Sequence, residues 1–288
     1  MTIKYCFNYK QFNTQLKSIF NSIHKLIVCK KTSAFTLAET LIVMGIIGIV
    51  AALTIPNLNS STNDMEKVTK FKKIYAQLNE AQSRAAAVYG PIEGWFTNVN
   101  CTNGASCTNG NKRYFDRITE FLKLQKSCRD SVGNCTADKN LFYMAGGRYS
   151  TTYNVSSKLP QVVIADGSAI ININIYNSKC DNKTSYSGSD FYCGYMFIDI
   201  DGPNKGKNML GLDLFSLAIT KDGIIPHYSA QNVSTDISLC TYYGYGCAIW
   251  ILEKGNMDYL KTPNKSSKAN SVICPNNKTL TWDSPTCK

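Results

Sequence analysis

Acidic residues are absent from the first 34 positions of this 288-residue chain, and histidine is scarce throughout. The six lysines of that segment supply part of the net charge of +11 and leave only +5 for the rest. A nucleic-acid-binding domain is expected to spread basic charge over its folded surface, so this distribution argues against that class. The sequence has no Cys-x-x-Cys pair, glycine-rich phosphate loop or nucleophile motif, so nothing positive indicates an enzyme.

Cysteine, in contrast, is abundant, with twelve residues. Cys6 and Cys29 lie in the basic start, and the other ten fall into five close sequential pairs. This pattern predicts disulfides and an oxidising compartment, the periplasm or the cell exterior. Nearest-neighbour pairing is one of several connectivities that the sequence allows. The candidates are Cys101, Cys107, Cys128, Cys135, Cys180, Cys193, Cys240, Cys247, Cys274 and Cys287.

A long apolar segment follows the basic start. Residues 35–55 read FTLAETLIVMGIIGIVAALTI, which is about the length of a helix that spans the hydrocarbon core of a membrane. Lys30 and Lys31 precede it, so the positive-inside rule predicts a cytoplasmic N-terminus and a periplasmic or extracellular remainder. Glu39 lies within the apolar segment, where a carboxylate is costly unless a cation pairs with it. A free amine at residue 35 of a neighbouring subunit would be such a cation.

Residues 34–39, AFTLAE, resemble the processing site of type IV prepilins and type II secretion pseudopilins. The resemblance implies that prepilin peptidase cuts between Ala34 and Phe35, that the new N-terminus is methylated, and that Glu39 pairs with the terminal amine of an adjacent subunit. Pro56 falls where the family usually has a proline, whereas Ala34 replaces the glycine that the family prefers before the cut. The resemblance also implies a self-polymer built with the help of inner-membrane assembly machinery.

A secretory signal peptide is the rival interpretation of the same segment. It too has a basic region followed by an apolar one, and residues 50–52 would satisfy its small-x-small cleavage rule. That interpretation gives Glu39 no purpose and requires an unusually long basic region. We therefore rank it below the pilin interpretation.

The chain is expected to continue as a helix and then a globular head. Pro56 predicts a kink or a locally melted turn, with the helix restarting near Asn63 and ending at Gly90. Spacings of three and four residues predict one buried stripe on this helix. The stripe consists of Val68, Phe71, Tyr75 and Leu78.

The head is predicted to be α+β, with a long N-terminal helix packed on a small antiparallel sheet stapled by disulfides. A second helix is expected over 111–125, and Asp-Gly pairs at 166–167 and 222–223 predict two hairpins within four or five strands. Segment 248–260 is compatible with a strand or a short helix. The expected divisions are a leader (1–34), an assembly helix (35–55), an amphipathic helix (56–92), a head (93–262) and a polar tail (263–288).

Two features of the head were weighed as binding sites. In the stretch IDIDGPNKGKNMLGLDLF, side chains with carboxylate or amide oxygens precede and follow a glycine. This pattern resembles a calcium-binding loop only loosely. A polar turn is therefore the favoured interpretation, and a calcium site is the alternative. The calcium candidates are Asp199, Asp201, Asn204 and Asp213. Tyr242, Tyr243 and Tyr245 suggest an exposed aromatic loop, and His227 is expected at the surface.

The sequence therefore predicts a non-enzymatic subunit of a type IV pilus or a type II secretion pseudopilus. Its expected partners are other pilins, prepilin peptidase, the inner-membrane assembly machinery and membrane lipid. The alternative is a minor pilin whose head binds DNA or a surface, and nucleic acid is the less favoured partner.

Overall fold

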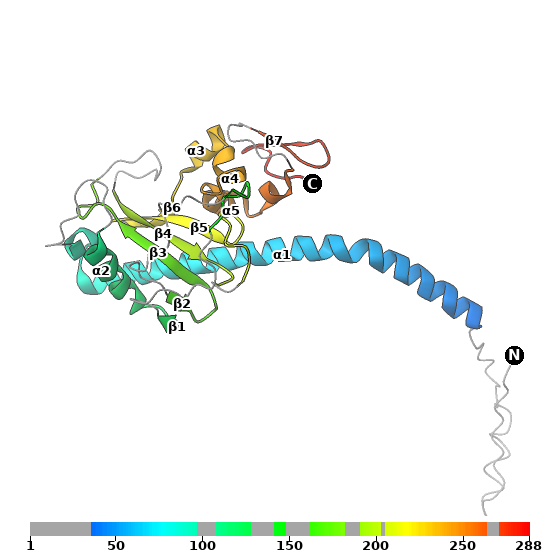
Figure 1. Cartoon of the computed structure of the whole chain (residues 1–288), viewed down its shortest axis with the longest axis horizontal. Helices are drawn as coiled ribbons and strands as arrows, with labels where there is room; N and C mark the ends of the chain where they lie inside the picture. The colour runs from blue at the N-terminus through cyan, green and yellow to red at the C-terminus, as the bar shows by residue number, and fades with distance from the viewer. Residues whose placement is uncertain are drawn as a thin grey trace, which may run out of the picture. The chain divides into compact units, whose positions relative to one another are not determined.

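The structure is a computed structural model that describes residues 36–96, 107–127, 141–147, 162–181, 191–202, 205–263 and 271–288, except for the side chains of 51–62 and 230. The chain divides between Ser60 and Ser61 into two compact units, each of which is described by itself. The described part of the first unit is the start of helix α1 (Leu37–Tyr89), and the second unit is the head (Figure 1).

Helix α1 is continuous where the sequence predicted an interruption. Its backbone is helical through Pro56 and through the polar residues that follow, so the predicted melted turn and restart near Asn63 are wrong. A proline removes one N–H from the hydrogen-bond ladder and crowds the carbonyl four residues before it, which costs stability but leaves the other bonds of the ladder. The helix ends as predicted before Gly90, whose φ of 79° suits glycine.

A six-stranded antiparallel meander forms the centre of the head, with the strands in chain order. Both predicted Asp-Gly hairpins are confirmed: one joins β2 to β3 and the other joins β5 to β6. The strands are β1 (Leu124–Ser127), β2 (Val162–Ile164), β3 (Ala169–Ile175), β4 (Tyr192–Asp199), β5 (Leu214–Thr220) and β6 (Gly223–Pro226).

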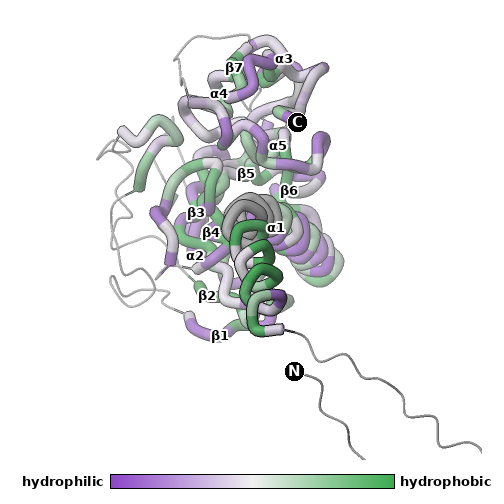
Figure 2. Tube along the Cα trace, turned by 90° about the vertical axis from the view of Figure 1, so that its right-hand side faces the viewer, coloured by the Kyte–Doolittle hydropathy of each residue, from purple (hydrophilic) through white to green (hydrophobic). Residues whose placement is uncertain are grey.

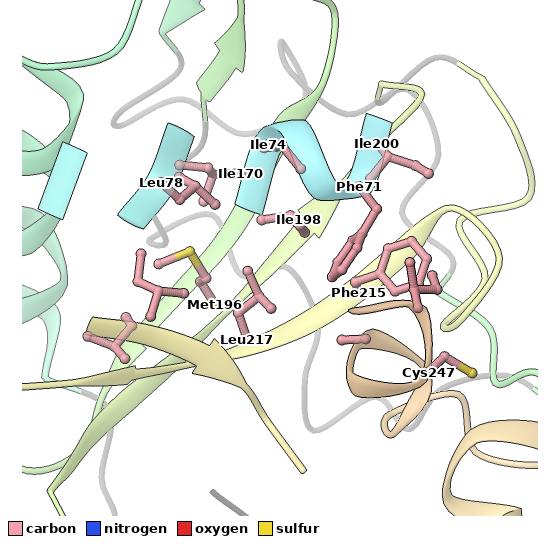
Figure 3. Packing of buried hydrophobic residues seen from close by; sticks show 14 of the residues in the cluster. Phe71, Ile74, Leu78, Ile170, Met196, Ile198, Ile200, Phe215, Leu217 and Cys247 are labelled. Atoms are coloured by element: carbon pink, nitrogen blue, oxygen red, sulfur yellow. The ribbon is translucent and has the colours of Figure 1, made fainter. Parts of the chain in front are cut away.

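One face of the sheet packs against the head portion of α1. Figure 3 shows Phe71, Ile74 and Leu78 directed at apolar residues of the central strands. The closest ring pair joins Phe71 to Phe215 of β5, with centroids 4.6 Å apart. Val68, Phe71 and Leu78 of the predicted stripe are buried and Tyr75 is half-buried, so the stripe is confirmed as core. The apolar partners in the sheet are Ile170, Met196, Ile198, Phe215 and Leu217.

The opposite face of the sheet carries a second buried cluster that is rich in aromatic residues. Tyr192, Tyr195 and Phe197 of β4 are buried in it, and Tyr176 and Tyr245 pack against it. Strands buried on both faces read as nearly continuous apolar runs, and β3, β4 and β5 show this pattern. The sheet is therefore the middle layer of the head and not its outer surface.

The element after the first head helix differs from the prediction. Helix α2 (Thr108–Thr119) ends six residues before the predicted boundary, and the chain then turns into β1, which pairs antiparallel with β2. The sequence of β1, LQKS, has no strand signal of its own, and all four side chains are exposed. Pairing with β2 overrides local propensity here, which explains the underestimate of the strand number.

Short helices and a small hairpin complete the head next to β5 and β6 (Figure 1). The ambiguous segment near residue 250 is mostly helical, and Gly255 ends α5 with a left-handed φ of 68°. These elements are α3 (Ala230–Thr235), α4 (Ser238–Thr241), α5 (Cys247–Lys254), η4 (Asp258–Lys261), β7 (Val272–Ile273) and β8 (Thr279–Leu280), whereas η2 (Ile92–Phe96) packs against α2.

Three of the five nearest-neighbour disulfides are confirmed. They join Cys180 to Cys193, Cys240 to Cys247 and Cys274 to Cys287. Cys107 is also disulfide-bonded. The remaining candidates, Cys101, Cys128 and Cys135, lie outside the described residues, as do Cys6 and Cys29.

Candidate functional site

The first turn of α1 is built around a reciprocal pair of side chains, Thr36 and Glu39. The Thr36 backbone N–H and hydroxyl donate to Glu39 Oε2 at 2.8 and 2.9 Å, and the Glu39 N–H donates to Thr36 Oγ1 at 3.2 Å. This is a capping box, in which a Thr and a Glu three residues apart satisfy each other's backbone donors. In the single chain, Glu39 therefore accepts its hydrogen bonds within its own subunit.

The residues after Glu39 present an apolar surface that this single chain leaves exposed. Side chains around the whole circumference of this part of α1 are exposed, and Met44 keeps 69% of its accessible area. Figure 2 shows the same stretch as strongly hydrophobic. An exposed surface of this size and composition marks a site of interaction with protein or lipid. The exposed large residues are Leu37, Leu41, Ile42, Val43, Met44, Ile46, Ile47, Ile49 and Val50.

The membrane and processing predictions have different outcomes. Within the part of the chain that the structure describes, no helix is both long enough and apolar enough to cross a membrane. Ala34 and Phe35 lie outside the described residues, and Pro56 is described only through its helical backbone. The processing site therefore stays a prediction from the sequence.

The predicted calcium loop brings three of its four candidate residues close together. The carboxylates of Asp201 and Asp213 meet around Gly206, where an added Cβ would lie 2.8 and 2.2 Å from their oxygens. Asp199 Oδ1 accepts from the backbone N–H groups of Asp201 and Gly202 at 3.2 and 2.9 Å. Asn204 lies outside the described residues.

Asp213 acts in this loop as an acceptor for backbone donors. Its two oxygens accept from the N–H groups of Lys207 and Met209 at 2.8 and 2.6 Å. These bonds match the favoured interpretation of a turn shaped by carboxylates. Among the described residues, no three or more acidic, histidine or cysteine side chains form a group that could hold a metal ion.

Burial and neighbouring acids perturb the charge of this loop. Burial, the contact with Asp201 and the charges of Asp201 and Asp213 together raise the pKa of Asp199 to about 8. Burial also raises the pKa of Asp213, although its two backbone bonds oppose the shift. Asp199 Oδ2 and Asp201 Oδ1 are both buried, and neither has a hydrogen-bond partner in the described residues. Burial and the repulsion from the neighbouring carboxylates disfavour the charged form of Asp199, which is the physical meaning of its raised pKa.

His227 and the tyrosine loop are not placed as the sequence predicted. The His227 ring stacks on Tyr195, with centroids 5.3 Å apart, and its Nδ1 lies 2.7 Å from Ser216 Oγ. Burial lowers the pKa of His227 to about 4. Tyr242, Tyr243 and Tyr245 are half-buried and not an exposed aromatic loop. The expected surface positions are wrong because the second face of the sheet has its own aromatic core.

Two polar residues of α1 matter in the structure but gave no signal as candidates. Asn79 binds the backbone of β6, and Gln82 Nε2 donates to the Thr220 carbonyl at 3.0 Å. Both lie beside the apolar stripe of α1, so periodicity places them at the edge of the buried face. Two amides three residues apart at this boundary do not show from the sequence whether they are solvated or are buried and hydrogen-bonded.

Comparison with known proteins gives one match. Residues 29–55 match the prokaryotic N-terminal methylation motif, and a search of curated proteins and of solved structures found no match. The matched segment contains Phe35 and Glu39. The chain therefore carries the N-terminal signature of type IV pilins and pseudopilins.

Proposed function

We propose that this protein is a structural subunit of a type IV pilus or a type II secretion pseudopilus. It is cut before Phe35, held in the inner membrane with its head on the outer side, and then polymerised through α1. The observation that carries the proposal is the exposed apolar surface of α1, which runs from Leu37 to Val50 around Glu39 and lies within the methylation motif. Side-by-side packing of such helices in an open helical array would bury this surface.

Glu39 has a definite task in this proposal. In the single chain its carboxylate accepts from Thr36. In the polymer, the terminal amine of a neighbouring subunit would supply a positive charge to the same carboxylate. A charge-assisted pair in an apolar environment is stronger than a neutral hydrogen bond and fixes the axial position of one helix against the next.

The decisive experiment compares Glu39→Ala with Glu39→Gln in cells that express the full chain. Glutamine can replace glutamate in a capping box but carries no charge. We expect both variants to remain in the membrane fraction and both to fall at least about ten-fold in sheared filaments, because loss of a buried charge pair costs more than about 1.4 kcal/mol.

The two variants separate the role in assembly from the role in capping. Normal filaments from Glu39→Gln would show that Glu39 acts as a helix cap and not as a partner of the amine. Thr40→Val, one residue further along, serves as the control for substitution in this segment. The alternative of a minor pilin that binds DNA stays a prediction, tested by salt-sensitive retention of duplex DNA by the purified chain.

A further inference from the structure

Strand β6 is one of the two edges of the sheet and follows β5 through a tight hairpin. An edge strand normally presents unpaired backbone donors and acceptors to which another strand can add. In an antiparallel pair, alternate residues direct their N–H and C=O groups toward the partner strand and away from it. The outward-directed groups of β6 therefore decide whether this edge can accept another chain.

Asn79 of α1 occupies the outward side of β6 at Ile224. Asn79 Nδ2 donates to the Ile224 carbonyl at 3.0 Å, and the Ile224 N–H donates to Asn79 Oδ1 at 2.9 Å. One side-chain amide thus makes the two bonds that one residue of an added strand would make. The approach is close, because a Cβ at Gly223 would lie 3.1 Å from Asn79 Oδ1.

The next outward position of β6 is Pro226. Ile224 lies opposite Ile219, and Pro226 lies opposite Leu217. Because these positions are two residues apart, they face the same way, and Ile224 faces Asn79. Proline has no N–H, so position 226 offers an incoming strand no donor. In β6, one outward residue is therefore capped and the next lacks its donor.

We propose that Asn79 and Pro226 close the β6 edge against pairing with the β6 edge of a second copy of this chain. Asn79 is then a specificity-determining residue, because it denies the head association through this strand edge. The occupant excluded is a second copy, since identical edge strands can pair antiparallel about a two-fold axis. This inference goes beyond the proposed function, because it concerns the head and holds whether or not α1 polymerises.

The first test measures the edge itself, in detergent, with the full chain carrying Glu39→Ala so that association through α1 is suppressed. At low protein concentration, Asn79→Ala should make amide exchange at Ile224 about ten-fold faster, because the Ile224 N–H loses its acceptor and the free energy of local opening falls. Unchanged protection of Ile224 in this variant would show that Asn79 does not cap the edge and would overturn the inference.

The second test measures association. The double variant Asn79→Ala/Pro226→Val frees both groups of Ile224 and adds a donor at position 226. We expect this variant to form dimers in analytical ultracentrifugation and to regain protection at Ile224 as its concentration rises. A double variant that stays monomeric while Ile224 exchanges rapidly contradicts the inference.

Gln82→Ala is the matched control. It also removes a hydrogen bond between α1 and the hairpin, but the Thr220 carbonyl that it frees belongs to β5. It removes in addition the acceptor of the buried Tyr114 hydroxyl. This control should lose stability and remain monomeric, and dimers from it would attribute association to a loosened head and overturn the role of the edge. If Asn79→Ala does not fold, Asn79→Leu replaces it, since leucine has nearly the same size and removes both hydrogen bonds to Ile224. A monomeric Asn79→Leu/Pro226→Val variant would then count against the inference.

Discussion

Asp199 shows how a single buried acid makes the stability of the head depend on pH. Its pKa is raised to about 8 in the folded chain, from an ordinary value of 3.8, because burial and the neighbouring acids disfavour its charged form. Between these values the folded state binds a proton that the unfolded state has released. The contribution of Asp199 to stability is therefore fully present below pH 4 and is lost as pH rises toward 8.

We expect Asp199→Asn to weaken this dependence. The variant should be at least about 1 kcal/mol more stable than wild type at pH 8, because each pKa unit corresponds to about 1.4 kcal/mol, and the difference should shrink toward pH 4. Urea unfolding of the purified chain across this pH range measures it. Parallel pH profiles for the two proteins would contradict the raised pKa of Asp199.

The same titration tests the calcium hypothesis. A divalent cation beside Asp199 and Asp201 would supply positive charge and stabilise the charged form of Asp199. Calcium should then raise the wild-type unfolding midpoint at pH 8 and leave that of Asp199→Asn unchanged. If millimolar calcium does not change the unfolding midpoint of the wild type, the calcium hypothesis is wrong and only the interpretation as a polar turn remains.

The sequence identified individual candidate residues where a side chain differed in polarity from the residues around it. Glu39 was noticeable because a carboxylate lay in an apolar run, and Thr36 could have been predicted as its capping partner from the T-x-x-E spacing. Asn79 was not predictable, because an amide beside an apolar stripe is usually a solvated residue. Only the position of β6 shows that its two hydrogen-bonding groups meet a strand edge.

At the scale of elements, hairpins and the buried stripe were predicted well because local chemistry determines them. The Asp-Gly pairs require turns whatever surrounds them, and the three-and-four spacing places Val68, Phe71 and Leu78 on one face. Strand β1 and the unbroken helix at Pro56 depend instead on partners distant in sequence or on cooperativity along the helix. Neither influence is visible within a short window of residues.

Substitution of Phe71 tests how much the contact between α1 and the sheet contributes to the stability of the head. Its side chain is fully buried against Phe215, so Phe71→Ala should lower the free energy of unfolding by about 3–5 kcal/mol. Val88→Ala, at an exposed position of the same helix, should change it by less than about 0.5 kcal/mol. Equal effects of the two substitutions in urea unfolding would mean that α1 does not pack on this sheet.

At the scale of the whole molecule, the two units have opposite surface properties. The described part of the first unit leaves apolar side chains exposed, whereas the head buries its sheet on both faces and has a closed edge at β6. In the proposed polymer, association would be directed to α1, where burying the apolar side chains would supply the driving force. The three described disulfides strengthen this division, because cross-links within the head restrict its unfolding and keep its core from competing contacts.

The intact mass of the protein from the membrane fraction tests the arrangement as a whole. Cleavage before Phe35 removes Cys6 and Cys29, so the mature chain should begin at Phe35, carry one N-methyl group and hold its other ten cysteines as disulfides. Reduction should then add the mass of ten hydrogens, and cells without prepilin peptidase should yield the unprocessed chain. A chain that begins at Leu53 would place the apolar surface on a discarded signal peptide. Polymerisation through α1 would then be impossible, while the β6 edge would remain closed, since it needs only residues of the head.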